Sequence, residues 1–125
     1  MILLDTSVLI DCLTRDRPLL SNLTRMLEQG ERMGISTLVL YEWLRGPRLP
    51  HELSLQEVLF PSEAALLFEP ADARISAELY RSAPRARSRE IDLAIAACAI
   101  RHEAELWTLN RADFAGIPKL RLLKR

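Results

Sequence analysis

The chain has 125 residues, 49% of them apolar and 27% charged, and its formal net charge is zero. This size and balance predict a single globular domain, residues 1–125, which buries roughly two-thirds of its unfolded surface without a disulfide or metal staple. The zero net charge gives no global sign of a polyanionic partner. No apolar run approaches the ~20 residues of a membrane span, and no signal peptide is visible, so we expect no membrane contact and a cytoplasmic location.

The first half of the chain predicts short strands that alternate with helices. Ile2 to Leu4 form an apolar run that is typical of a buried strand. Pro18 is favoured in the first turn of a helix, while Gly30 and Gly46 are favoured where helices end. The expected elements are strands at residues 2–4 and 34–36 and helices at about 7–13, 16–30, 37–45 and 51–59.

The second half continues the alternation. The expected elements are strands at 66–68, 106–109 and 120–123, a helix from Pro70 that ends before Pro84, and a helix at 91–100. The last of these helices is apolar nearly all round, which predicts a central and buried position. Strands alternating with helices predict an α/β fold: a three-layer sandwich whose central, mostly parallel sheet has about five strands and helices on both faces.

Four acidic side chains stand where a charge is costly. Asp5 ends the first strand, Glu42 lies in the apolar segment LVLYEWL, and Asp92 lies near the start of the buried helix IDLAIAACAI. Asp113 follows a late strand and stands three residues after Asn110, which places the two on one face of a helical turn. One buried carboxylate could pair with an arginine, but four together are harder to explain in that way.

The positions of these acids predict a shared cation site. Ligand sites of open parallel sheets form at the carboxyl ends of the strands. Asp5 and the pair Asn110 and Asp113 fall at that edge, and Asp92 can face it from the start of its helix. Converging carboxylates repel one another unless a cation lies among them, and oxygen ligands without His or Cys select Mg²⁺ or Mn²⁺.

The other residue types that bind metals are expected to lie outside this site. Cys12 and Cys98 fall in apolar helical segments and are expected to be buried, reduced thiols. His51 and His102 match no ligand spacing, and we expect both at the surface.

These motifs resemble the PIN-domain ribonucleases, and most closely the VapC-type toxins of bacterial and archaeal toxin–antitoxin pairs. The resemblance runs from MILLDTSVLID through the mid-chain glutamate to IDLAIAACAIRHEAELWTLNRADF and the terminal strand. The D-T-S opening is a weak signal alone, whereas an acid at 92 followed by T-x-N-x-x-D-F is specific. The resemblance implies a PIN-like sandwich, an acidic pocket that uses Mg²⁺ or Mn²⁺, and endoribonuclease activity.

The resemblance also implies a role for each acid. Asn110 stands where the family has its fourth Asp or Asn, and Asp113 could supply the charge that an amide lacks, so the fourth member of the site stays open between them. Thr6 and Ser7 are expected to bring hydroxyls near the first acid and to cap the helix that follows it. The residues expected to be catalytic are Asp5, Glu42, Asp92 and Asp113, and those expected to hold the metal are the same four with Asn110.

Arginine dominates the positive charges, because only Lys119 and Lys124 among the 17 cationic residues are lysines. Arginine suits bidentate contact with phosphate. Three arginines of the basic segment before the third acid are expected to contact RNA phosphates, and a solvated connection is the alternative for them: Arg85, Arg87 and Arg89.

The resemblance implies a type II toxin that cleaves RNA phosphodiesters with metal-activated water. Its expected partners are RNA, a small DNA-binding antitoxin of the VapB kind and a second copy of the chain. Apolar helix residues could contact these partners or belong to the core: Leu19, Leu23, Leu38, Trp43 and Leu44. The alternative function is a catalytically weak or inactive PIN-like module that binds RNA or a partner.

Overall fold

The fold is built on a parallel sheet in a computed structural model that describes residues 1–14 and 18–124. The described residues form four strands in the order β2-β1-β3-β4, all parallel. Their bounds are β1 (Ile2–Leu4), β2 (Met33–Gly34), β3 (Glu105–Trp107) and β4 (Arg121–Leu122). The N-terminal strand therefore lies in the interior of the sheet, where Leu4 pairs with Trp107.

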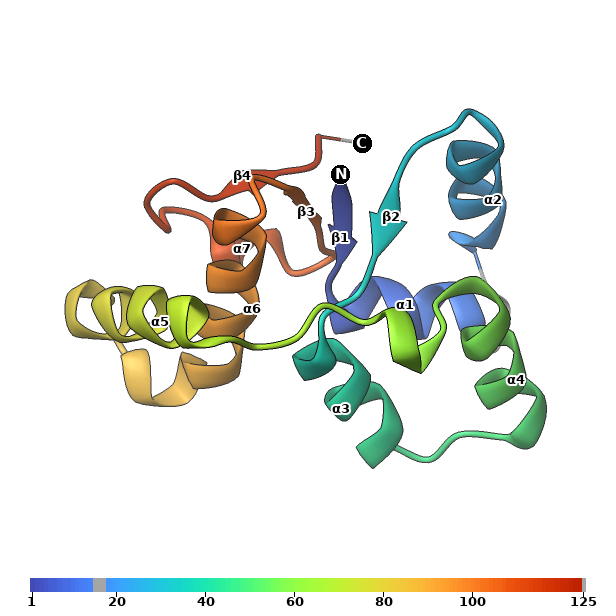
Figure 1. Cartoon of the computed structure of the whole chain (residues 1–125), viewed down its shortest axis with the longest axis horizontal. Coiled ribbons are helices and arrows are strands. Elements are labelled where there is room, and N and C mark those ends of the chain that lie inside the picture. Colours follow the sequence, from blue (N-terminus) through green and yellow to red (C-terminus); the bar gives the residue numbers. More distant parts are fainter. Residues whose placement is uncertain (15–17, 125) are drawn as a thin grey trace.

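Helices surround this sheet, as the alternation of elements predicts (Figure 1). The helices are α1 (Thr6–Leu13), α2 (Leu20–Glu28), α3 (Thr37–Arg45), α4 (Pro50–Leu59), α5 (Pro70–Ser82), α6 (Glu90–Arg101) and α7 (Arg111–Phe114), with 3₁₀ turns η1 (Ser62–Ala64) and η2 (Ala86–Arg89). The strands point their carboxyl ends toward α1 and α3, while α2 lies on one flank and α5 with α6 on the other (Figure 1). None of the helices in the described part of the chain is long and apolar enough to span a bilayer.

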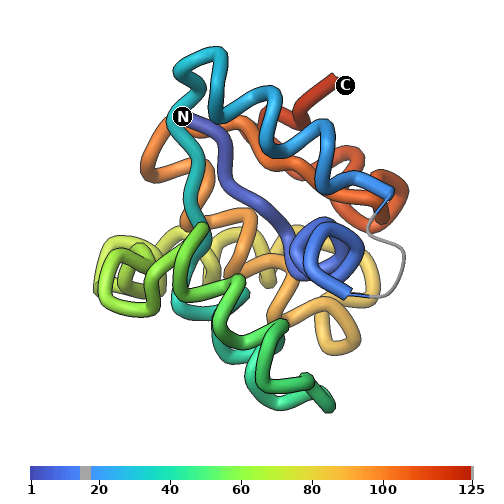
Figure 2. Tube along the Cα trace, turned by 90° about the vertical axis from the view of Figure 1, so that its right-hand side faces the viewer, coloured from blue at the N-terminus to red at the C-terminus, as the bar shows by residue number. Residues whose placement is uncertain are grey.

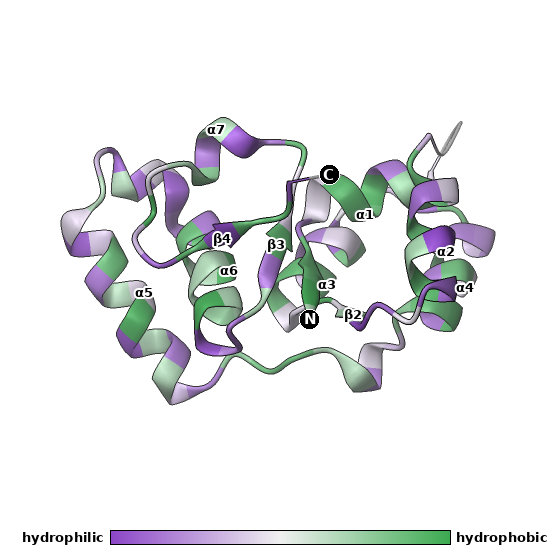
Figure 3. Cartoon of the chain, turned by 90° about the horizontal axis from the view of Figure 1, so that it is seen from above, coloured by the Kyte–Doolittle hydropathy of each residue, from purple (hydrophilic) through white to green (hydrophobic). Residues whose placement is uncertain are grey.

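The core joins the central strands to α1 and α6. The residues Ile2, Leu3 and Leu4 are at most 2% exposed, and α6 buries six consecutive or near-consecutive positions between Leu93 and Ala99. Figure 3 shows the same elements as predominantly hydrophobic. Each fully buried leucine of this kind contributes about 1.5–3 kcal/mol, so the strand that ends in Asp5 is firmly anchored.

Most expected elements are confirmed, with three differences. The strand expected at 66–68 is reduced to a single bridge between Ser36 and Leu66, which leaves four strands instead of about five among the described residues. The basic connection at 81–90 is partly ordered as η2, after Arg85 adopts a left-handed backbone with φ 51°. The helix expected at 16–30 begins only at Leu20, so that Pro18 lies in a turn before α2; residues 16–17 of this expectation lie outside the described residues, and α2 ends before Gly30, whose φ is 86°.

Some of the expectations for single side chains are confirmed, and others are wrong. Cys12 and Cys98 are buried and unpaired, and burial raises the pKa of their thiols to about 12 and about 11. His51 is exposed, but the expectation for His102 is wrong, because its Nε2 is buried without a hydrogen-bond partner. Of the apolar helix residues, Leu23 and Trp43 belong to the core, Leu19 and Leu38 pack partly buried against it, and Leu44 is exposed.

A buried ion pair fastens α5 to α6. Asp72 has no exposed surface, and it accepts hydrogen bonds from Arg101 Nε (2.5 Å) and Nη2 (3.0 Å) and from the backbone N–H of Glu69 (2.8 Å). Burial alone would raise the pKa of Asp72, but the hydrogen bonds from Arg101 and from the Glu69 N–H, with the nearby positive charge, together lower the pKa below its usual value. This pair holds α6, which carries Asp92, against the neighbouring helix.

Candidate active site

Asp5 lies at the carboxyl end of β1 and is 4% exposed. Its backbone N–H continues the sheet by donating to the Trp107 carbonyl (2.8 Å), and its carbonyl starts α1 by accepting from Val8 and Leu9. The carboxylate Oδ2 accepts hydrogen bonds from Ser7 Oγ (2.9 Å) and Thr108 Oγ1 (2.7 Å). Two hydroxyls from segments 101 residues apart therefore fix this carboxylate at the edge of the sheet.

Thr6 and Ser7 bring hydroxyls to the acids, but they do not cap α1. Asp5 occupies the N-cap position, and no side chain makes a capping bond there. Thr6 Oγ1 donates to Glu42 (2.5 Å), whereas Ser7 Oγ donates to Asp5 and accepts from the Leu109 N–H (3.1 Å). The prediction that Thr6 and Ser7 cap this helix is therefore wrong, because both hydroxyls donate to carboxylates instead.

Glu42 faces the same site from the apolar helix α3. Its side chain is 16% exposed and forms an ion pair with Arg45, one helical turn later (3.2 Å). The other carboxylate oxygen accepts the hydrogen bond of Thr6. Because Ser36 caps the start of α3 with a bond to the Val39 N–H, the helix that carries Glu42 is held at the edge of the sheet.

Asp92, in the first turn of α6, lies in the electrostatic field of the other acids. Burial and, after it, the negative charges of Asp5, Glu42 and Asp113 together raise its pKa to about 6, while Arg89 opposes them. Charges act on a carboxyl group in this way only when they lie near it. Acids from four separate segments therefore share one neighbourhood in the folded chain.

Asn110 and Asp113 follow β3 at the short helix α7. Asn110 precedes the helix, its backbone N–H donates to Thr108 Oγ1 (2.9 Å), and its carbonyl accepts from the Asp113 N–H (3.0 Å). Both side chains are exposed. The charge of Asp113 raises the pKa of Asp92, whereas the uncharged amide of Asn110 offers only a carbonyl oxygen as a ligand.

The three arginines expected to meet RNA lie on or beside η2. Arg85 and Arg87 are exposed, whereas Arg89 is half-buried. The Arg89 guanidinium donates to the backbone carbonyls of Asp113 and Pro84 (3.5 Å to Pro84). Arg89 therefore connects the start of α6 to α7 in addition to placing a positive charge beside Asp92.

The side chains that converge here have the chemistry of a divalent-cation site. They offer carboxylate, hydroxyl and amide oxygens, which are the ligands of Mg²⁺ and Mn²⁺, and the repulsion at Asp92 is of the kind that a cation relieves. Within residues 1–14 and 18–124, no group of three or more His, Cys, Asp or Glu side chains is arranged to hold a metal ion. The donor set fits such an ion in the chemistry of its oxygens, but the described side chains are not arranged as a preformed ligand cluster.

Thr108 is the member of this network that the acidic pattern does not reveal. It is 5% exposed, donates to Asp5 and accepts from the Asn110 N–H, so it connects β1 to the start of α7. Thr108 is visible in the sequence as the threonine of the motif T-x-N-x-x-D-F. A threonine after a strand is too common to be singled out without knowing which strands are neighbours.

Comparison with known proteins identifies the family of the chain. The PIN domain family matches residues 2–120. The chain is 34% identical over 123 residues to Ribonuclease VapC19 of Mycobacterium tuberculosis, an alignment that covers 96% of this chain and 97% of that protein.

Solved structures have the same fold. DNA-bound VapBC from Salmonella typhimurium superposes with a TM-score of 0.78 at 22% identity, over 98% of this chain and 96% of the other. FitAcB from Neisseria gonorrhoeae gives 0.70 at 21%, over 98% and 97%. A toxin–antitoxin complex from Klebsiella pneumoniae gives 0.71 at 25%, over 96% and 95%. The chain therefore belongs to the PIN-domain family, among its VapC-type members.

Proposed function

We propose that this chain is a divalent-metal-dependent endoribonuclease and the toxin of a type II toxin–antitoxin pair. The observation that carries the proposal is the meeting of Asp5, Glu42 and Asp113 around Asp92, seen in the raised pKa of Asp92. The 34% identity to a ribonuclease, over 96% of this chain, supports RNA as the substrate.

The proposed metal ligands are the four acids, with Asn110 in the outer part of the site. A divalent ion, Mg²⁺ or Mn²⁺, supplies positive charge that offsets the phosphodiester and makes water a stronger nucleophile when it is bound there. Asp5 and Asp92 are the best placed to hold it, because Asp5 is fixed by two hydroxyls and Asp92 carries the repulsion that a cation would remove.

Glu42 is the proposed acceptor of the proton from the attacking water. Its two oxygens are oriented by Thr6 and by Arg45, so the carboxylate is positioned before substrate arrives. Arg85, Arg87 and Arg89 are the proposed contacts to the phosphates of the strand on the α6 side, with Arg89 also holding α7 in place.

The proposed partners are RNA, a small DNA-binding antitoxin of the VapB kind and a second copy of the chain, in the cytoplasm. The VapBC and FitAB structures that share this fold are described as bound to DNA, which supports an antitoxin of that kind. Tyr41 and Leu44 are 55% and 52% exposed on α3, which supports an additional protein contact.

The test is cleavage of single-stranded RNA by the purified chain with Mg²⁺, Mn²⁺ or EDTA. We expect cleavage only with a divalent ion, and we expect Asp5→Asn and Asp92→Asn to reduce it to the background of the buffer while circular dichroism shows a folded protein. The exposed Glu78→Gln on α5 is the matched control and should retain activity. Full activity in either Asn variant would contradict the assignment, and RNA binding without cleavage in both metals would favour the binding module.

A further inference from the structure

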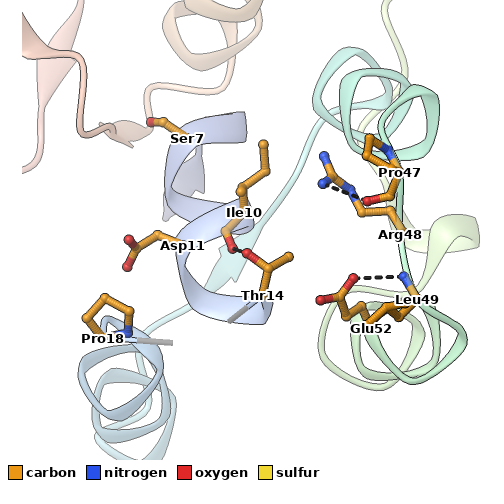
Figure 4. A pocket seen from close by; sticks show the side chains of 9 residues that line it. All are labelled: Ser7, Ile10, Asp11, Thr14, Pro18, Pro47, Arg48, Leu49 and Glu52. Atoms are coloured by element: carbon orange, nitrogen blue, oxygen red, sulfur yellow. Dashed lines mark hydrogen bonds between the residues drawn. The ribbon is translucent and has the colours of Figure 1, made fainter. Parts of the chain in front are cut away.

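Two hollows open beside the candidate site, one lined by α1 and the other by α2. The first, about 770 Å³, lies between α1 and the start of α4 (Figure 4). The second, about 410 Å³, lies between α2 and the segment that follows β3. Ser7 lines the first and Thr108 lines the second, so each begins at a hydroxyl that hydrogen-bonds Asp5.

The first hollow is poorly suited to a polyanion. Its lining includes two acids, Asp11 and Glu52, and one cation, Arg48 (Figure 4). That arginine is already engaged, because its guanidinium stacks over Trp43 at 4.3 Å and donates to the Trp43 carbonyl (2.9 Å). The Asp11 carboxylate points away from Arg48 and Glu52 (Figure 4), so a phosphate between α1 and α4 would meet Glu52 and no free positive charge among the described lining residues.

The second hollow has the opposite character. Arg25 and Arg111 line it together with Asn22 and Gln29, and none of the described lining residues is an acid. Neither arginine forms an ion pair with any acid in the described ranges 1–14 and 18–124. Arg111 is held in place by a bond from its Nη1 to the Leu123 carbonyl (2.6 Å), which leaves its other N–H groups for a ligand.

The hollow is also connected directly to the acids. Thr108 forms part of its wall and donates to the Asp5 carboxylate, and Figure 2 shows α2 running past the C-terminal segment that carries Arg111. A polyanionic strand that enters a site of four carboxylates needs nearby positive charge to offset the repulsion.

We propose that the hollow between α2 and the segment after β3 is a subsite for the substrate strand, in which Arg25 and Arg111 bind backbone phosphates of single-stranded RNA next to the scissile bond. The subsite rests on the proposed ribonuclease function. It places the RNA strand in the second hollow, which Arg25 lines, and not in the first hollow, which Glu52 lines. Asn22 and Gln29 add neutral donors that contact the strand without reading its sequence.

The experiment measures binding of a fluorescent single-stranded RNA oligonucleotide by anisotropy in EDTA, and steady-state cleavage with Mg²⁺, at several salt concentrations. We expect Arg25→Ala to weaken binding about fivefold and to reduce the slope of log affinity against log salt by about one. Arg25→Glu should weaken RNA binding further, and Arg25→Lys should retain most of the binding. In the cleavage assay, the substitutions should raise KM more than they lower kcat.

Arg74→Ala is the matched control, because Arg74 is exposed on α5, on the far flank. The proposal is overturned if Arg25→Ala and Arg74→Ala have equal affinity and equal salt slopes, or if Asp11→Asn strengthens binding while Arg25→Glu does not weaken it. Because Arg25 lies on the surface of α2, these variants keep the fold, and circular dichroism verifies it. Absence of any cleavage by the unmodified chain would instead contradict the ribonuclease function itself.

Discussion

At the scale of single residues, the site consists of carboxylates held by hydroxyls. Asp5 and Glu42 receive the hydroxyl bonds of three residues, and the backbone N–H groups of Leu109 and Asn110 fix two of those hydroxyls in turn. Asp92 has no such bond among the described residues, and it carries the raised pKa. Burial and the charges of the other acids therefore disfavour the ionised form of one carboxyl group, that of Asp92.

The burial of Asp92 and the negative charges around it predict that Asp92→Asn stabilises the metal-free protein. The pKa of Asp92 is about 6 in the folded chain and near 3.8 in the unfolded chain, so the folded state binds more protons between these values and loses stability as pH rises through them. At pH 7.5 in EDTA, removal of the charge should raise the free energy of unfolding by about 1–2 kcal/mol.

Thermal unfolding in EDTA across pH 4 to 8 measures this effect. Asp92→Asn should melt higher than the unmodified chain at pH 7.5 and close to it at pH 4, and Mg²⁺ should raise the melting temperature of the unmodified chain only. Equal melting temperatures at pH 7.5 would show that neither burial nor the neighbouring acids disfavour the Asp92 carboxylate in the folded chain.

Thr108 gives a second prediction at this scale. Thr108→Val keeps the shape of the side chain but removes the donor to Asp5 and the acceptor for the Asn110 N–H, which should cost about 1–2 kcal/mol of stability and lower kcat. Urea denaturation and steady-state cleavage measure the two effects. Thr108→Ser keeps the hydroxyl and is the control, and if Val and Ser behave alike, the hydroxyl has no part in holding Asp5.

At the scale of elements, α6 matters most, because its first turn carries Asp92 and its last turn carries the buried pair with α5. The sequence predicts this helix well, since its apolar residues are continuous and only a central helix tolerates them. It does not predict the pairing of Arg101 with Asp72, because the two lie 29 residues apart and several acids are within similar separation. The strand predicted at 66–68 is wrong for a related reason. An apolar run of three residues does not indicate whether a neighbouring strand lies beside it, and only a single bridge forms there.

The α5–α6 pair predicts a large and specific loss of stability. Asp72→Asn should lower the free energy of unfolding by about 2–4 kcal/mol, because it leaves the Arg101 guanidinium without its buried partner. Since the folded-state pKa of Asp72 is lowered, the pair stabilises the protein above pH 3.8 and this contribution is lost as pH falls below it.

Urea denaturation at pH 7.5 tests the pair. Glu69→Gln is the control, because Glu69 also pairs with Arg101 (3.1 Å) but is 53% exposed, and we expect it to change stability by less than about 1 kcal/mol. Equal effects of the two substitutions would mean that burial does not strengthen the Asp72 bond.

At the scale of the whole molecule, the zero net charge conceals a local separation of charge. Acids gather where the strands end, and arginines lie beside them on α2, η2 and α7. The composition could not predict this arrangement, because it depends on which segments the topology makes neighbours. The family pattern of acids could be read from the sequence, whereas the hydroxyl network and the Arg25 hollow required the fold.

The interior position of β1 in the sheet has a consequence for how the protein is made. Asp5 is synthesised about a hundred residues before Thr108 and Asp113, which complete its surroundings together with β3. A nascent chain that ends before these residues therefore carries Asp5 without the hydroxyl of Thr108 and without the neighbouring strand. The acids of the candidate site assemble only after the segment that follows β3 has been synthesised.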